Sequence, residues 1–204
     1  MTDILRQALT YARRGWPVFP CLPGQKIPAT RHGYRDATTD QQQITDWFGH
    51  GAGWNLAIAT GAPGPDVLDV DQHGPTGNGF AALTTLRRAG LAGGAAAYVR
   101  TPAGGMHLYF TGSDQHNGRL PSHHLDFRSQ GGYIIAPPSQ VNGQPYQLIK
   151  RLDGRSGSAL IPARPRTGTW TLWPAGWPAS PKATATPACT GPPTAPWPPI
   201  PPPT

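Results

Sequence analysis

Apolar residues follow two different periods along residues 1–150, and each period predicts one kind of element. Helical spacing, with apolar side chains three or four residues apart, predicts amphipathic helices over residues 3–14, 38–49 and 80–90. Short apolar runs, several of them alternating with polar residues, predict strands over residues 16–22, 55–60, 67–71, 96–101, 106–110, 125–129, 133–137 and 146–150. The pattern therefore predicts a mixed α/β fold of the α+β kind, with strands following one another more closely in its second half.

Capping residues and prolines refine the first of these elements. Asp3 is placed to cap the first helix, and either Thr39 or Asp40 is placed to cap the second. Prolines within residues 16–22 limit that run to an edge strand or an extended segment, because proline cannot donate a hydrogen bond inside a sheet.

Two pairs of neighbouring strands are separated by short glycine-containing segments. Residues 96–101 and 106–110 flank one such segment, and residues 125–129 and 133–137 flank another that contains Gly131 and Gly132. Because glycine adopts the backbone conformations of tight turns, we expect each pair to form an antiparallel hairpin.

The composition changes after about residue 163. Fourteen of the final 44 residues are proline, and the chain ends in PPIPPPT. Such a segment cannot build a core and favours extended polyproline conformations. We therefore expect a folded domain over residues 1–163 and a flexible, disordered Pro-rich tail over residues 164–204, which serves either as a ligand for a partner or, as we favour, as a spacer.

Charge and cysteine content narrow the classes of function. The formal net charge of +7 is typical of a protein with an anionic partner, such as nucleic acid or a nucleoside triphosphate, although a generic basic surface gives the same value. The two cysteines lie far apart and have no zinc-ligand spacing, so no zinc site is expected. The sequence has no long apolar run, so we expect a cytoplasmic protein without a membrane partner.

Two aspartates stand two residues apart in the predicted strand VLDVD. Residues two apart on a strand point to the same side, so the carboxylates of Asp69 and Asp71 would lie together and repel one another unless a cation lay between them. Carboxylate oxygens at this spacing suit Mg²⁺ or Mn²⁺. The alternative is that both are surface acids where the strand ends.

A second candidate is the run GGMHLYF, in which Gly104 and Gly105 form a tight turn and His107 follows on a strand. Backbone at a glycine turn can approach a ligand closely, and a histidine beside it can contact a phosphate. The alternative is a half-buried histidine whose hydrogen bonds are made within the protein.

A third candidate is the run LDFRSQGGYIIAPPS. Asp126 and Arg128 fall on one face of the predicted strand, where they form either part of a site or a structural ion pair. The two consecutive prolines that follow force a rigid exit from the next strand.

Taken together, D-x-D, G-G-x-H and D-x-R followed by APPS resemble the motif series of the bifunctional DNA primase/polymerase N-terminal domain family, within the archaeo-eukaryotic primase superfamily. The opening segment ALTYARRGWPVFPCLPGQKIPA and the pattern N-x-x-x-A-T-G from Asn55 to Gly61 are also similar to that family. The resemblance covers about residues 5–150. It implies a primase–polymerase core with an RRM-like catalytic sheet.

The resemblance also implies roles for individual residues. Asp69, Asp71 and Asp126 correspond to the catalytic, metal-binding acids, which would hold two divalent ions, Mg²⁺ or Mn²⁺. Some members carry Glu where this chain has Asp71, a conservative difference. The residues expected to bind the nucleotide are His107, Arg128, Gly104 and Gly105. Weaker candidates for contact with the template or a phosphate, as opposed to a solvated loop, are Lys26, Arg31 and Arg35.

The implied activity is template-directed nucleotidyl transfer in DNA replication, by a DNA primase/DNA polymerase. Its partners would be a single-stranded DNA template and NTP or dNTP substrates. The sequence has no GxxxxGK[ST] phosphate loop, so we expect a helicase to be supplied in trans. Two alternatives remain open: another two-metal enzyme such as a phosphoesterase or nuclease, and a non-catalytic DNA-binding module that keeps the fold.

Overall fold

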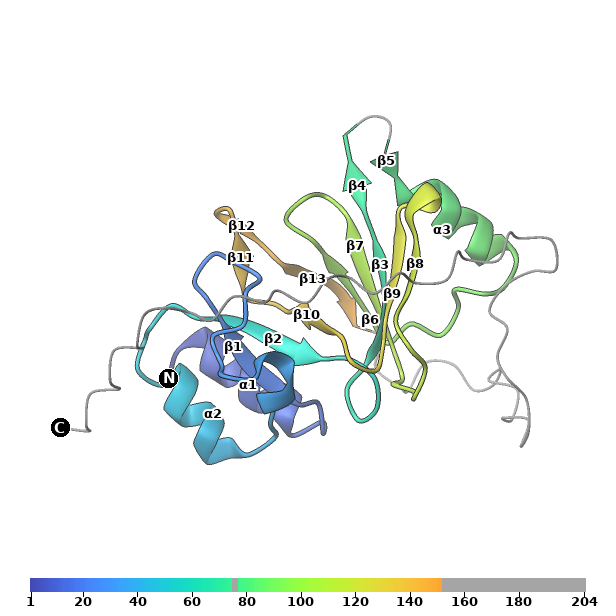
Figure 1. The fold of residues 1–204 in the computed structure, drawn as a ribbon. Coiled ribbons are helices and arrows are strands. Elements are labelled where there is room, and N and C mark those ends of the chain that lie inside the picture. The colour runs from blue at the N-terminus through green and yellow to red at the C-terminus, as the bar shows by residue number, and fades with distance from the viewer. Residues whose placement is uncertain (75–76, 152–204) are drawn as a thin grey trace, which may run out of the picture. The chain divides into compact units, whose positions relative to one another are not determined.

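The computed structural model describes residues 1–74 and 77–151, and the predicted tail at 164–204 lies outside the described residues. The described part contains three α-helices, two short 3₁₀ helices and mostly antiparallel strands, which confirms the predicted mixed α/β class (Figure 1). The helices are α1 (Asp3–Ala12), η1 (Gly33–Asp36), α2 (Gln41–Phe48), α3 (Gly79–Arg88) and η2 (Pro121–His123). The strands are β1 (Val18–Cys21), β2 (Asn55–Ala59), β3 (Asp66–Val70), β4 (Gln72–His73), β5 (Gly77–Asn78), β6 (Ala97–Arg100), β7 (Met106–Phe110), β8 (Gly118–Leu120), β9 (Leu125–Arg128), β10 (Tyr133–Ile135), β11 (Gln140–Val141), β12 (Gln144–Pro145) and β13 (Gln147–Arg151).

A six-stranded antiparallel sheet has the order β13-β6-β7-β3-β9-β8. Strand β3 lies inside this sheet and pairs with β7 on one side and β9 on the other. Its position gives β3 two strand neighbours, so residues from three segments that are distant in sequence come together beside it.

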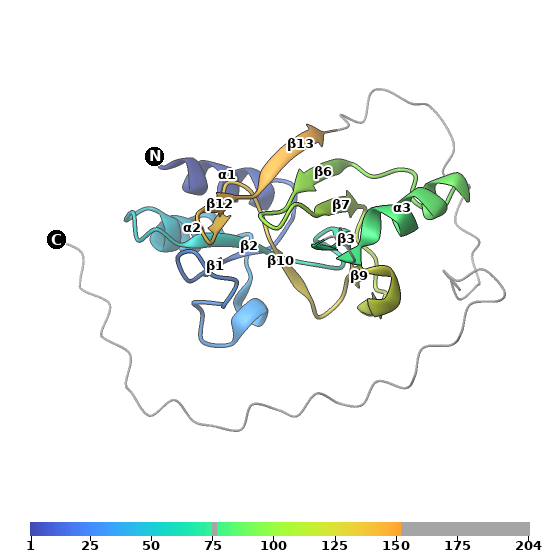
Figure 2. The same ribbon diagram turned by 90° about the horizontal axis from the view of Figure 1, so that it is seen from above.

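A three-stranded sheet has the order β1-β2-β10. Strand β1, which contains Pro20, is at its edge, as the prolines in residues 16–22 predict. Helices α1 and α2 lie beside this sheet, whereas α3 lies beside the six-stranded sheet at β3 (Figure 2).

The six-stranded sheet is packed on both faces because its strands alternate. Val67 and Tyr109 belong to one hydrophobic cluster, which also contains the buried side chains of α1, α2 and the three-stranded sheet. Val70 and Leu108 point the other way into a second cluster with Leu83 of α3. The two clusters hold β3 from both sides.

Helix starts follow the expected capping chemistry with one correction. Asp40 caps α2 by accepting a hydrogen bond from the backbone N–H of Gln43. Helix α1 is capped by Thr2 and not by Asp3, because the Thr2 hydroxyl accepts from the backbone N–H of Leu5 while Asp3 already lies inside the first turn.

One predicted hairpin forms and the other does not. Strands β6 and β7 pair as expected. Strands β9 and β10, however, belong to different sheets, so the hairpin predicted across Gly131 and Gly132 is wrong. The linking segment is instead fixed to the end of β2, because the Thr60 hydroxyl donates to the Ser129 carbonyl and the Thr60 N–H donates to the Gly132 carbonyl.

Within the described ranges, no helix is both long enough and apolar enough to cross a membrane.

Candidate active site

Three of the side chains predicted to carry chemistry stand in one row across the six-stranded sheet. Asp69 on β3 lies directly opposite His107 on β7, and on its other side it lies directly opposite Asp126 on β9. Arg119 on β8 continues the row, because it pairs with Asp126. Directly opposed residues of neighbouring strands project from the same face of a sheet, so the four side chains are adjacent.

Asp69 and His107 form the centre of this row. The Nε2 atom of His107 lies 3.3 Å from Oδ1 of Asp69. Burial raises the pKa of Asp69, but the hydrogen bond from His107 and the charges of His107, Arg128 and Lys26 outweigh it and hold the pKa below its usual range. Asp69 is therefore ionised at neutral pH.

His107 is almost enclosed by the protein. The ring of Tyr109 lies beside it on the same strand, and the ring of Tyr146 lies on another side, with centroids 5.6 Å apart for the Tyr146 pair. The Nδ1 atom of His107 is buried and has no hydrogen-bond partner within the described ranges. The imidazole is thus held mainly by packing, and Nε2 is the atom turned toward Asp69.

Asp126 is buried, and both of its oxygens accept hydrogen bonds from arginines. Nη2 of Arg128 donates to Oδ2 at 2.6 Å, and Nε of Arg119 donates to Oδ1 at 3.2 Å. Asp126 and Arg128 share a face of β9, as the sequence alternation predicts, and the structure pairs them as ions. One carboxylate therefore orients two guanidinium groups.

Asp71 lies one residue beyond the end of β3. Its backbone N–H donates to the carbonyl of His124, and its carboxylate is 3.8 Å from Nε2 of His73. Partial burial and the neighbouring charges of Asp69 and Asp126 raise its pKa. Burial and nearby carboxylates both disfavour the ionised form of Asp71, and a bound cation would favour that form.

The two turn glycines are explained by close packing against the end of β3. A Cβ on Gly105 would collide with the backbone carbonyl of Val70, and Gly104 has a φ of 87° and lies against the side chain of Gln72. Both positions require glycine. They bring the β6–β7 turn next to Asp71.

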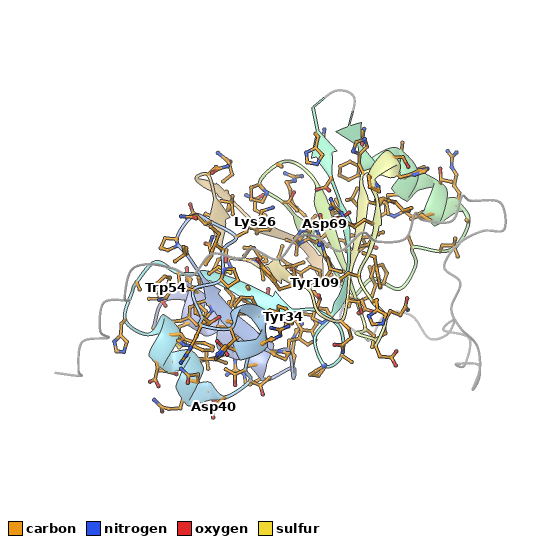
Figure 3. All side chains as sticks on the ribbon, in the orientation of Figure 1. Lys26, Tyr34, Asp40, Trp54, Asp69 and Tyr109 are labelled. Carbon is orange, nitrogen blue, oxygen red and sulfur yellow. The ribbon has the colours of Figure 1, made fainter. Side chains whose placement is uncertain are left out.

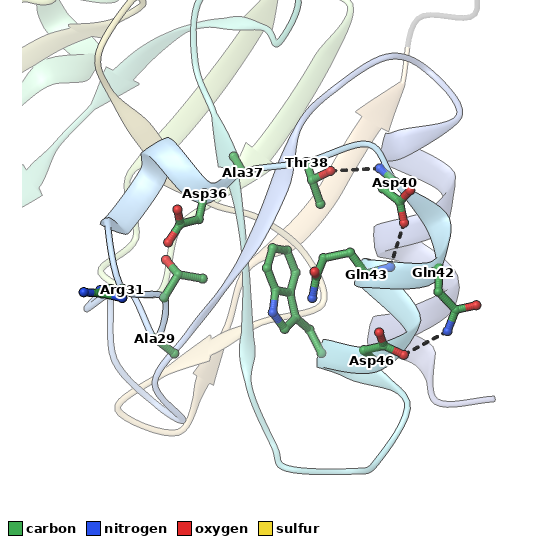
Figure 4. A pocket seen from close by; sticks show the side chains of 11 residues that line it. Ala29, Arg31, Asp36, Ala37, Thr38, Asp40, Gln42, Gln43 and Asp46 are labelled. Atoms are coloured by element: carbon green, nitrogen blue, oxygen red, sulfur yellow. Dashed lines mark hydrogen bonds between the residues drawn. The ribbon is translucent and has the colours of Figure 1, made fainter. Parts of the chain in front are cut away.

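The three basic residues of the early loop lie in different places. The charge of Lys26 contributes to the lowered pKa of Asp69 and partly offsets the raised pKa of Asp71, and Figure 3 shows Lys26 beside Asp69. Arg35 packs over the ring of Tyr34 at 5.8 Å. Arg31 lines a separate pocket of about 840 Å³ formed by η1 and α2, which none of the three acids lines (Figure 4).

Two motif residues of the resemblance have structural roles. The side-chain amide of Asn55 donates to the carbonyls of Gln25 and Gln140. Ser139 of the APPS segment accepts from the N–H of Leu56 and is fully enclosed. These bonds attach two segments to the same end of β2: the loop that carries Lys26, and the segment that follows β10.

Sequence reasoning missed Arg119 and Tyr146. Arg119 lies on a three-residue strand within HNGRLPS, where glycine, proline and polar residues hide any alternation. Tyr146 precedes β13 and reads as an ordinary core aromatic. Only the pairing of β8 with β9 and the packing against His107 reveal their places.

The carboxylates have the donor chemistry that a hard divalent ion needs. Within the part of the chain that the structure describes, no three His, Cys or Asp side chains are already arranged as a metal site. A carboxylate has about four lone-pair positions, so Asp126 keeps capacity beside its two arginines. Asp71, at the end of the strand that carries Asp69, adds a further carboxylate of the kind that binds such ions.

Comparison with known proteins supplies one match. The family model described as bifunctional DNA primase/polymerase, N-terminal, matches residues 8–167. This range includes every residue of the row and the loop of Lys26. A search of curated proteins found no match to the chain.

Proposed function

Because the chain belongs to the bifunctional DNA primase/polymerase N-terminal family, whose members are nucleotidyltransferase-type enzymes, we propose that it catalyses template-directed nucleotidyl transfer. The observation that supports this most directly is the row of Asp69, His107 and Asp126 on three adjacent strands. The row places acids that suit metal ions beside a histidine that suits a phosphate. The expected role in DNA replication, with unwinding by a separate helicase, is part of this proposal.

Enzymes of this family generally use divalent metal ions. In the proposal, Asp69, Asp71 and Asp126 hold two ions, Mg²⁺ or Mn²⁺. Bound there, such ions would lower the pKa of the attacking hydroxyl and stabilise the charge of the leaving pyrophosphate. The chain contributes by fixing the carboxylates: Asp69 and Asp126 are opposed in register, and Asp71 is anchored through its backbone.

The remaining residues of the site bind and orient the substrate. His107 lies beside Asp69 with Nε2 directed at that carboxylate, and Arg128 is oriented by Asp126, so in the proposal both border the place of the triphosphate. Lys26 adds a positive charge from the loop after β1. The turn at Gly104 and Gly105 lets backbone approach the nucleotide.

The RRM-like sheet belongs to the same proposal. Along the chain, β3 is followed by α3, β6 and β7, and β9 then pairs with the free side of β3. This β-α-β-β order and the antiparallel arrangement of β6-β7-β3-β9 support an RRM-like core.

A synthesis assay on a single-stranded DNA template tests the proposal. Labelled NTPs or dNTPs are supplied with and without a primer, in Mg²⁺ and in Mn²⁺. We expect product from the wild-type chain and a loss of at least about 100-fold in Asp69→Ala/Asp71→Ala, because the metal ions contribute several kcal/mol to the transition state. Asp46→Asn, an exposed acid on α2, is the matched control and is expected to keep full activity.

Two outcomes contradict the proposal. Release of nucleotides from labelled DNA in Mn²⁺ without added nucleotides would identify a nuclease that uses the same acids. DNA binding without product under any condition would identify a non-catalytic module.

A further inference from the structure

We propose that Arg119 binds a backbone phosphate of the nucleic-acid strand that enters the site along β8. This inference rests on the proposed function and assigns a residue that the sequence motifs do not contain. It names the ligand as a phosphodiester of the DNA strand and not as the triphosphate of the incoming nucleotide.

Arg119 is anchored at one end and presented to solvent at the other. Its Nε donates to Asp126 Oδ1 at 3.2 Å, yet its side chain is 71% exposed, while that of Asp126 is 6% exposed. The described residues offer it no second carboxylate. Because Nε is the atom that is held, the two terminal nitrogens of the guanidinium group remain available as a fork for a phosphate.

The charges around Asp126 favour the binding of an anion on the β8 side of the row. Asp126 carries one negative charge and contacts two guanidinium groups, those of Arg119 and Arg128. Because Arg128 is the closer of the two to Asp126, the charge of Arg119 is the less compensated one, and it lies on the β8 side of the row. The opposite balance is found at Asp69 and Asp71, two carboxylates that stand two residues apart where β3 ends. A phosphate is therefore attracted to Arg119, and a cation is attracted to the carboxylates of Asp69 and Asp71.

The position of Arg119 along the row distinguishes the two sources of phosphate. His107 and Arg119 lie on opposite sides of Asp69, three strands apart, which is about 14 Å at the usual spacing of strands. In phosphoryl transfer the attacking and leaving oxygens lie roughly in line on opposite sides of the phosphorus. If the triphosphate lies at His107, the strand that carries the attacking hydroxyl approaches from the side of Arg119.

The test compares Arg119→Gln with Arg88→Gln in the full 204-residue chain. Arg88 is an exposed arginine at the end of α3, on the other face of the sheet, and is the matched control. The affinity for a fluorescently labelled single-stranded DNA is measured over a series of salt concentrations, without nucleotide or metal. The affinity for dNTP is measured separately in Mn²⁺.

For Arg119→Gln we expect DNA affinity to fall about 10-fold at low salt, as for one lost charge-assisted hydrogen bond. The slope of log affinity against log salt should decrease in magnitude by about 0.7, the value for one phosphate contact on single-stranded DNA. Affinity for dNTP should stay unchanged, and Arg88→Gln should match the wild type. Arg119→Lys should recover most of the slope, because it restores the charge.

An unchanged salt slope with reduced turnover would overturn the inference, since Arg119 would then only position Asp126. Reduced dNTP affinity with unchanged DNA binding would also overturn it, because the phosphate would belong to the triphosphate. Failure of the proposed function looks different: the wild-type chain would make no product, and the slopes of the two variants would still differ.

Discussion

At the scale of single residues, the two acids of the D-x-D motif have opposite electrostatic settings. Asp69 has a partner in His107 and a lowered pKa, whereas burial and the charges of Asp69 and Asp126 raise the pKa of Asp71. The ionised form of Asp69 is therefore stabilised by folding, and the ionised form of Asp71 is destabilised by it. The two carboxylates repel one another, and a bound cation would reduce this repulsion.

We expect Asp71→Asn and Asp69→Asn to shift stability in opposite directions when metal is removed with EDTA. A raised pKa means that stability falls as pH rises through the window above 3.8, so Asp71→Asn should raise the unfolding midpoint at pH 7. A lowered pKa contributes stability that is lost as pH falls below 3.8, so Asp69→Asn should lower the midpoint. Shifts of about 2–4 °C correspond to changes near 1 kcal/mol in a chain of this size.

Thermal unfolding followed by circular dichroism measures both shifts. Adding Mn²⁺ should stabilise the wild type more than either variant, because each variant has lost a carboxylate that would hold the ion. Shifts of the same sign in the two variants at pH 7 would contradict the assigned electrostatics.

At the scale of elements, the β6–β7 turn is held at a fixed distance from the end of β3. Gly105 is packed so closely against the Val70 carbonyl that no Cβ fits between them. The turn therefore cannot move away from Asp71 without disturbing the sheet. Glycine is needed at this position because of a close backbone contact, and not because of its conformational freedom.

We expect Gly105→Ala to destabilise the fold by about 1–3 kcal/mol, as overpacking does, and to reduce synthesis by displacing the turn. Gly93→Ala is the matched control, because a Cβ there meets open space and its backbone conformation suits alanine. It should leave stability within about 1 kcal/mol of the wild type. Urea unfolding and the synthesis assay provide the two readouts, and equal effects of the two substitutions would contradict the account.

Sequence patterns predicted those elements whose determinants are local. The helices, the edge position of β1 and the β6–β7 hairpin follow from periodicity, prolines and a glycine turn. The separation of β9 from β10 was not predictable, since it depends on hydrogen bonds from Thr60, about seventy residues away. The row at Asp69 also depends on contacts between segments that are distant in sequence. Alternation along a strand predicts which face each side chain is on, but only the pairing of the strands sets which residues are opposite one another.

Arg119 shows the same limit. Its strand has three residues, too few for a period to be recognised, and its place beside Asp126 is set entirely by the neighbour strand. The motif resemblance predicts roles for Asp69, His107 and Asp126 but carries no information on a residue outside the motifs.

At the scale of the whole folded body, Cys21 reports on the integrity of the core. It is fully buried in the cluster shared by α1, α2 and both sheets, and burial raises the pKa of its thiol to about 12. A thiol in this setting is neutral and inaccessible at neutral pH. It becomes reactive only when this core opens.

We expect Cys21, in a Cys189→Ser background, to react with a thiol reagent at pH 8 at least about 1000-fold more slowly in the native protein than in denaturant. Because the folded pKa is raised from 9.0, stability should fall as pH rises above 9 toward 12. Labelling followed by mass spectrometry measures the first effect, and urea unfolding at pH 8 and pH 10 measures the second. Rapid labelling of the native chain would show that the core opens locally near β1.

The location of β3 inside its sheet has a consequence for hydrogen–deuterium exchange and for which positions tolerate substitution. The backbone amides of an interior strand are protected on both flanks, so β3 should be among the last segments to take up deuterium, whereas β8 at the margin should exchange early. Asp69 and Asp126 lie on the interior strands β3 and β9, whereas Arg119 lies on the edge strand β8. Under the proposed function, substitutions on β8 would alter nucleic-acid binding and leave the strands that carry these two acids undisturbed.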